Sequence, residues 1–302
     1  MPVLIAFNPV SGRGRAARAA DALAADLARV GIESRAVATA REPAAAWLRS
    51  ELAGSAALVV LGGDGAVRSV AHEAAFARVP IWHAPMGTEN LFARHFGMTA
   101  DPAAIALALA RGAVTEIDFG AVATADGPGD AIGHFAIMAS MGFDAEVVHA
   151  LARRRTGAIT RGSYLPALLE CARRWKPPVV SWTIDGETER LGPGIIVIGN
   201  LPEYGARLDP TPHARRDDGA LDAVFLPADG GWSAVAWLPL LRLGMHGAHP
   251  SVRFRRGARI EVQARSPACI QLDGDPAGPP EGVRTLRIEI AGVRLPVLLP
   301  PR

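Results

Sequence analysis

Residues 56–65 read AALVVLGGDG, an apolar run that leads directly into Gly62-Gly63-Asp64-Gly65. The run is typical of a buried strand, and the glycines after it would let a phosphate approach bare backbone N–H groups. Asp64 adds a carboxylate, which suits the magnesium that accompanies a nucleotide triphosphate. A plain strand-to-helix turn could carry the same four residues. A second loop of this kind, Pro85–Asn90 (PMGTEN), follows the next short strand and favours nucleotide binding.

Apolar strands and helices alternate around this stretch up to about residue 120. Such alternation is typical of a parallel sheet with helices on its faces, whose binding sites lie at the carboxyl ends of the strands. We therefore expect an α/β nucleotide-binding domain over residues 1–122. We also expect the C-terminal strand 290–302 to join this domain. The expected strands are 3–7, 35–38, 56–61 and 81–84, and the expected helices are 15–30, 43–52, 66–78, 90–96 and 102–111.

Short strands separated by Gly, Pro and Asp clusters follow over residues 123–289. This rhythm is typical of an antiparallel β-sandwich, here interrupted by three helices. The expected strands are 135–139, 179–184, 195–198, 223–226, 259–263, 269–272 and 284–290, and the expected helices are 145–154, 164–174 and 232–243.

Composition excludes several classes of protein. The chain has 302 residues, 49% of them hydrophobic, and a formal net charge of +2, which gives no reason to expect nucleic acid as a partner. Lys176 is the only lysine and stands before two prolines, so neither a P-loop nor the strand lysine of a protein kinase is present. Cys171 and Cys269 fit free thiols, and no apolar run reaches the length of a membrane span. We expect a cytoplasmic protein.

Three further stretches could carry chemistry. Asn8–Gly14 follows the first strand and could hold an anion; a dinucleotide fingerprint at Gly12 with Glu33 as its acid fits less well, because Glu33 precedes its strand. Asp217–Asp222 gathers three carboxylates, which suit a hard cation or a solvated turn. Asp273-Gly274-Asp275 is either a hairpin turn or a pair of candidate general bases.

Together these motifs resemble the bacterial diacylglycerol kinase / lipid kinase family, which is related to sphingosine kinases and more distantly to NAD kinases. The resemblance runs from Val3 to about Leu298 and rests on the order and spacing of many short motifs. They are Asn8–Gly12, Gly62–Gly65, Pro85–Asn90, Ile117–Gly120, Met141–Ala145, Asn200, Tyr204-Gly205, Pro212–Gly219 and Gln271–Gly274.

The resemblance implies a lipid-substrate β-sandwich domain, an active cleft between the two domains, and transfer of the γ-phosphoryl group of ATP to a lipid hydroxyl at the membrane surface. Asp273 would be the catalytic base with Asp275 beside it, while Asp64 and Asp118 would position the catalytic Mg²⁺. Asp218, with the carbonyls of Arg215 and Ala220, would hold a structural Mg²⁺. The implied nucleotide-binding residues are Asn8, Ser11, Gly12, Gly62, Gly63, Asp64, Gly65, Gly87, Thr88 and Asn90.

The chain also departs from the family pattern at Ala66, Arg68, Ser69 and Leu91, where the family usually has Thr, Asn, Glu and an acid. Alternatives therefore stay open: a kinase of a sphingoid base, a soluble alcohol or NAD, or a degenerate protein that binds lipid or nucleotide without catalysis. Homodimer formation and peripheral contact with the inner membrane surface also stay open.

Overall fold

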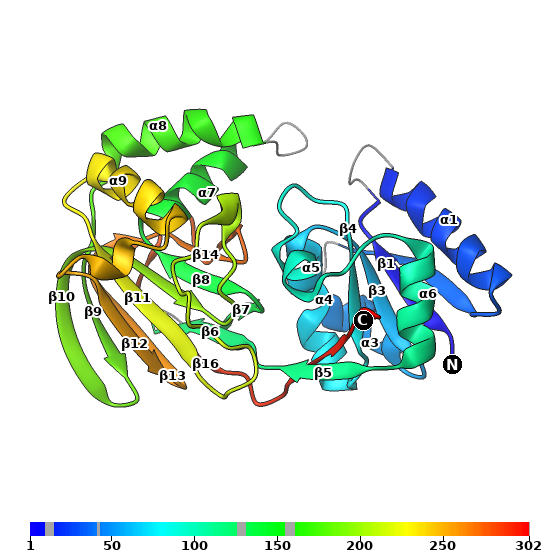
Figure 1. Ribbon diagram of the computed structural model, residues 1–302. Coiled ribbons are helices and arrows are strands. Elements are labelled where there is room, and N and C mark those ends of the chain that lie inside the picture. Colours follow the sequence, from blue (N-terminus) through cyan, green and yellow to red (C-terminus); the bar gives the residue numbers. More distant parts are fainter. Residues whose placement is uncertain (10–14, 41–42, 126–130, 155–160, 302) are drawn as a thin grey trace. The chain divides into compact units, whose positions relative to one another are not determined.

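The structure, a computed structural model, describes residues 1–9, 15–40, 43–125, 131–154 and 161–301. The chain divides into two compact units (Figure 1). The first comprises Met1–Ile117 and Gly292–Arg302, and the second comprises Asp118–Ala291. These divisions fall a few residues from the expected boundaries at 122 and 290.

A six-stranded sheet with the order β2-β1-β3-β4-β17-β5 forms the centre of the first unit. All neighbours are parallel except β17 and β5. Residues after 294 therefore complete a sheet that the first 117 residues begin. The strands are β1 (Val3–Phe7), β2 (Ser34–Ala38), β3 (Ala57–Gly62), β4 (Ile81–Pro85), β5 (Val114–Ile117) and β17 (Leu295–Leu298).

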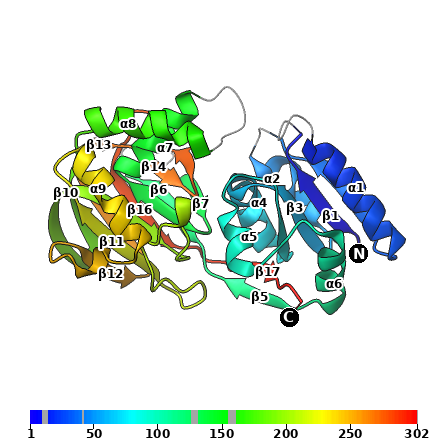
Figure 2. The same cartoon turned by 45° about the horizontal axis from the view of Figure 1, so that its top comes forward.

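Helices cover both faces of this sheet (Figures 1 and 2). The chain moves from β1 to β2 in one direction and from β3 to β4 in the other, so crossovers of the same hand place α1 and α4 on opposite faces. The α1 face is apolar at Ala16, Ala20, Leu23 and Leu27, which recur at helical spacing. The helices are α1 (Arg15–Arg29), α2 (Ala44–Trp47), α3 (Arg49–Leu52), α4 (Asp64–Ala77), α5 (Leu91–Phe96) and α6 (Pro102–Arg111).

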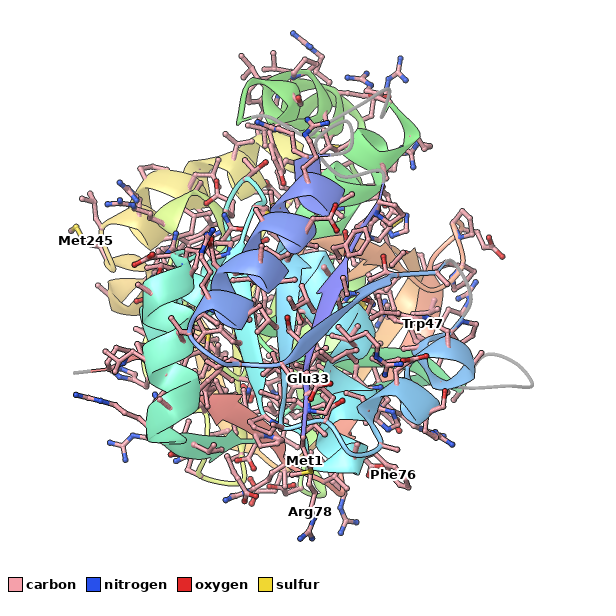
Figure 3. All side chains as sticks on the ribbon, turned by 90° about the vertical axis from the view of Figure 1, so that its right-hand side faces the viewer. Met1, Glu33, Trp47, Phe76, Arg78 and Met245 are labelled. Atoms are coloured by element: carbon pink, nitrogen blue, oxygen red, sulfur yellow. The ribbon has the colours of Figure 1, made fainter. Side chains whose placement is uncertain are left out.

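Two helices of this unit differ from the expectation. The single helix expected over 43–52 is interrupted at Leu48, giving α2 and α3. α4 begins at Asp64 rather than at residue 66, so Asp64 lies in its first turn. The other end of α4 closes at Arg78, which adopts a left-handed conformation with φ 55°, and Phe76 and Arg78 point outward from this end (Figure 3).

The second unit is an antiparallel β-structure of two sheets that share strand β10. The first half of β10 pairs with β9, and its second half pairs with β8 and β11. A bulge between Arg190 and Gly192 lies in the half that pairs with β9, shortly before β10 changes partners. The strands are β6 (Gly120–Thr124), β7 (Ala131–Phe135), β8 (Met138–Met141), β9 (Val179–Ile184), β10 (Glu187–Gly199), β11 (Leu221–Pro227), β12 (Arg253–Gly257), β13 (Arg259–Ala268), β14 (Ile270–Leu272), β15 (Asp275–Ala277) and β16 (Val283–Ile290).

Side chains from both sheets share one apolar core, which includes Phe135, Trp182, Ile198, Phe225 and Val262. The helices of this unit lie together over the sheet that contains β8, β11 and β14 (Figure 2). The expected fold class, a parallel α/β domain followed by an antiparallel β-sandwich domain, is confirmed. The helices are α7 (Phe143–Arg153), α8 (Tyr164–Arg174) and α9 (Gly231–Arg242), with short 3₁₀ turns η2 (Arg161–Ser163), η3 (Gly205–Arg207) and η4 (His246–Ala248).

One expected strand is wrong in a way that matters for the site. The sequence pattern predicts a single strand over 135–139, but β7 ends at Phe135 and β8 begins at Met138. The chain turns at Ala136 and Ile137 because their N–H groups bind a distant carboxylate, that of Asp273. Among the helices of the described residues, none is long and apolar enough to cross a membrane.

Candidate functional site

The two glycine loops of the first unit touch each other at the carboxyl ends of β3 and β4. A Cβ placed on Gly87 would lie 2.7 Å from the Cα of Gly63 and 2.9 Å from Oδ1 of Asn90, so only glycine fits there. Met86 N–H donates to the Gly62 carbonyl (2.8 Å), which aligns the two loops. The result is a surface of bare backbone at the amino end of α4, where N–H groups and the helix dipole favour an anion.

Asp64 joins the same two loops through its side chain. Its Oδ2 accepts the N–H of Leu91 and its Oδ1 accepts the N–H of Phe92, both at 2.9 Å. The carboxylate thus caps the amino end of α5, a role that the family resemblance does not imply. Leu91, where the family usually has an acid, contributes this backbone bond and buries its side chain.

Asn90 shapes the second loop. Its side chain accepts the N–H of Gly87 and donates to the Gly87 carbonyl, both at 2.8 Å. Its backbone is left-handed, with φ 51° and ψ 52°, a conformation that Asn tolerates better than most residues. Thr88 is exposed within this loop. Asn90 therefore supplies loop geometry before any contact with a nucleotide.

His83 supports the first loop from the sheet beneath it. The ring is fully buried on β4, and its Nε2 lies 2.9 Å from the carbonyl oxygen of Gly62. Burial lowers the pKa of His83, so the ring is neutral and donates to that carbonyl. His83 belongs to none of the sequence motifs, although a histidine inside an apolar strand (IWHAP) is a usable signal.

The remaining first-unit candidates follow β1 in the sequence. Asn8 follows β1 directly and is half-buried, whereas Ser11 and Gly12 lie outside the described residues. β1 and β3 are neighbours from which the chain diverges in opposite directions, and ligands of such sheets bind at this switch point. Glu33 lies at the amino end of β2, away from the glycine loops, which argues against the dinucleotide interpretation (Figure 3).

In the second unit, Asp273 lies in the tight turn between β14 and β15 and is almost fully buried. Its Oδ2 accepts the N–H of Ala136 (2.9 Å), and its Oδ1 accepts those of Ile137 (2.9 Å) and Met138 (2.8 Å). Three backbone donors stabilise the carboxylate and fix its position. Asp275 follows in the same turn, partly buried, and pairs with Leu272 across the hairpin.

A polar cluster lies behind this hairpin. Gln271 accepts the N–H of Gly274 (2.8 Å) and donates to the hydroxyl of Ser140 (2.9 Å). Ser140 and Tyr204 both donate to Oδ2 of Asp144, Tyr204 at 2.6 Å. Burial raises the pKa of Asp144, while these donors oppose that shift. The cluster connects α7 to the turn that carries Asp273.

Asp118 belongs to the same assembly. It is buried, its N–H donates to the Arg216 carbonyl and its Oδ2 accepts the Gly219 N–H, both at 2.6 Å. Asn200 is also buried and donates to the carbonyls of Asp118 (2.7 Å) and Ala136 (2.9 Å). The backbone around Asp118, Asn200 and the turn that holds Asp273 is therefore one hydrogen-bonded structure, although these residues are far apart in the sequence.

The residues of the implied structural magnesium site make contacts of their own in the structure. Asp218 Oδ1 accepts the Ala220 N–H (3.3 Å), and its Oδ2 pairs with the guanidinium of Arg256. Arg215 is exposed just before it. Among the described residues, no three His, Cys, Asp or Glu side chains are arranged to hold a metal ion. A carboxylate already paired with a cation does not suit a divalent metal, which needs several free oxygen ligands.

Family models match both units of the chain. The diacylglycerol kinase catalytic domain matches residues 2–122, and the YegS C-terminal NAD kinase beta sandwich-like domain matches residues 137–294. Solved structures share this fold. A diacylglycerol kinase from Bacillus anthracis str. Sterne superposes with a TM-score of 0.68 at 17% identity, covering 99% of this chain and 97% of its own. Another structure from that organism gives a TM-score of 0.75 at 21% identity, covering 99% and 95%.

Curated relatives are similar over most of their length. "Diacylglycerol kinase" of Mycobacterium tuberculosis (strain ATCC 25618 / H37Rv) is 30% identical over 90% of this chain and 88% of its own. "Probable lipid kinase YegS-like" of Pseudomonas aeruginosa (strain UCBPP-PA14) is 35% identical over 82% of this chain and 78% of its own. With both units matched and relatives this similar, the chain belongs to the diacylglycerol kinase family of lipid kinases.

Proposed function

We propose that the protein transfers the γ-phosphoryl group of Mg·ATP to a primary hydroxyl of a lipid such as diacylglycerol. The observation that carries the proposal is the contact between Gly63 and Gly87, which leaves two backbone loops bare beside the amino end of α4. Backbone N–H groups and a helix dipole are what the phosphates of a nucleotide require. Asn8, Gly62–Gly65 and Gly87–Asn90 would bind them, together with Ser11 and Gly12.

The acceptor hydroxyl would meet a carboxylate of the β14–β15 turn. We assign Asp273 as the group that orients the hydroxyl and accepts its proton, with Asp275 beside it. Phosphoryl transfer depends more on positioning of the reactants and on neutralisation of charge than on a strong base. The three N–H donors on Asp273 supply position, since they hold its carboxylate in place. Asp64 and Asp118 would position the magnesium of the Mg·ATP substrate through water.

Transfer of labelled γ-phosphate from Mg·ATP tests the proposal. The acceptors are diacylglycerol, monoacylglycerol, ceramide, sphingosine, undecaprenol and NAD, the lipids in detergent micelles. Gly87→Ala is the variant expected to lose activity, because its Cβ would clash with Gly63. Gly292→Ala is its control, because a Cβ there meets nothing within 4 Å.

We expect label in one lipid, lost in Gly87→Ala and kept in Gly292→Ala. Label in NAD or another soluble acceptor alone would refute the lipid assignment. ATP binding by calorimetry, without transfer to any acceptor, would favour a degenerate binder, and the departures at Ala66, Arg68, Ser69 and Leu91 would then explain the lost activity.

A further inference from the structure

Arg256 on β12 lies among the carboxylates that precede and begin β11. Its guanidinium pairs with Asp218, and its Nε lies 3.8 Å from Oδ2 of Asp222. Asp222 and Arg256 are direct partners in the antiparallel pairing of β11 with β12. The register of β11 and β12, rather than charge attraction, therefore brings this arginine to the acidic loop.

Strand alternation separates Arg256 from its neighbours. Arg253 and Arg255 both reach Glu189, at 3.5 and 3.0 Å, on the opposite side of β12. Successive side chains of a strand point to opposite faces, so only Arg256 of these three can face Asp218 and Asp222. Of these three arginines, Arg256 alone is placed to neutralise the acidic loop.

We propose that Arg256 is the built-in cation of the loop 215–222 and that the second unit needs no resident magnesium ion there. A divalent ion would require free oxygens of Asp218, but that carboxylate is paired with Arg256 and accepts the Ala220 N–H. The same guanidinium also lies beside Asp222, so one cation offsets both carboxylates. The proposal concerns the resident ion only and holds whichever acceptor the enzyme uses.

The loop that Arg256 neutralises is the one that holds Asp118. Backbone bonds from Arg216 and Gly219 fix Asp118 from two sides. Without a cation, Asp218 and Asp222 would repel each other at the base of this loop. Arg256 therefore preserves the backbone around Asp118 without help from solvent ions.

Thermal unfolding without nucleotide tests the inference. Each protein is measured in EDTA and in millimolar MgCl₂, and wild type is also assayed for bound magnesium by elemental analysis after gel filtration. The variants are Arg256→Gln, the charge-retaining Arg256→Lys, and the control Arg255→Gln, which breaks a pair on the other face of β12.

Wild type and Arg255→Gln should show no Tm difference between the two buffers. Arg256→Gln should lose roughly 2–5 °C in EDTA, since the pair is half-exposed, and should regain part of it with magnesium. Arg256→Lys should resemble wild type in its indifference to magnesium. A stoichiometric magnesium ion in wild type, or a wild-type Tm that falls in EDTA, would overturn the inference. An Arg256→Gln variant with the same Tm as Arg255→Gln in both buffers would also overturn the inference. None of these results depends on kinase activity.

Discussion

Replacing Asp273 with Asn should destabilise the second unit as well as impair phosphoryl transfer. Asn has the same shape and tolerates the backbone of this residue, whose φ is 50°. Its amide oxygen can keep the bonds from Ile137 and Met138, but its NH₂ must then face the N–H of Ala136. One buried donor is left unpaired, and the other two bonds lose their charge.

The cost follows from these contacts. Losing a hydrogen bond to a charged group costs about 1.5–3 kcal/mol, and weakening the other two adds about 1 kcal/mol. For a unit of this size, the total of about 2.5–4 kcal/mol corresponds to a Tm lower by roughly 5–15 °C. Asp275→Asn, in the same turn but partly exposed, is the control and should change Tm by only a degree or two.

Calorimetry and a kinase assay at low temperature, where the variant stays folded, separate the two roles of Asp273. We expect both a lower Tm and a kcat lower by roughly 10²–10⁴. An unchanged Tm would refute the anchoring of the 136–138 turn by this carboxylate. A lower Tm with unchanged kcat would refute the assignment of Asp273 to the acceptor hydroxyl.

Three further outcomes follow from the contacts. Asn90→Ala should raise the KM for ATP several-fold with little effect on kcat. The variant loses two hydrogen bonds within the loop and a residue suited to a φ of 51°. An unchanged KM would contradict the role of this loop. Burial raises the pKa of Cys171 to about 11 and that of Cys269 to about 12, so a disulfide reagent at pH 8 should label them at a measurable rate only after unfolding; rapid native labelling would contradict their burial. Burial raises the pKa of Asp144. Its contribution to stability is therefore present below its unfolded pKa of about 4 and is lost as the pH rises through the folded value. Asp144→Asn should flatten the decline of Tm over that pH range, and parallel Tm curves for variant and wild type would refute this assignment.

Local patterns predicted most of the first unit and the two loops of its candidate site. The apolar run before Gly62 and the two glycine loops are consecutive residues, so the sequence shows them directly. The sequence could not show that both carboxylate oxygens of Asp64 accept N–H groups of α5, because this contact joins two segments that are separate in the sequence. The departure at Leu91 leaves this contact intact, since any residue other than proline supplies the N–H.

The second unit was predicted less well because its site is made of long-range contacts. The break between β7 and β8 depends on a carboxylate 135–137 residues further along the chain, and no local propensity signals it. Arg256 likewise meets Asp218 only through the register of β11 and β12. Asp273 is a candidate through its motif, but the motif gives no hint of its three backbone donors.

The position of β17 has a consequence for how the chain is made. β5 ends at Ile117, and the strand that pairs with it starts at Leu295. A ribosome adding about 5–20 residues per second delivers the second strand roughly 9–35 s after the first. Throughout that interval the open edge of β4 lacks its partner while the whole intervening unit emerges and folds. The first unit is therefore begun first and finished last during synthesis.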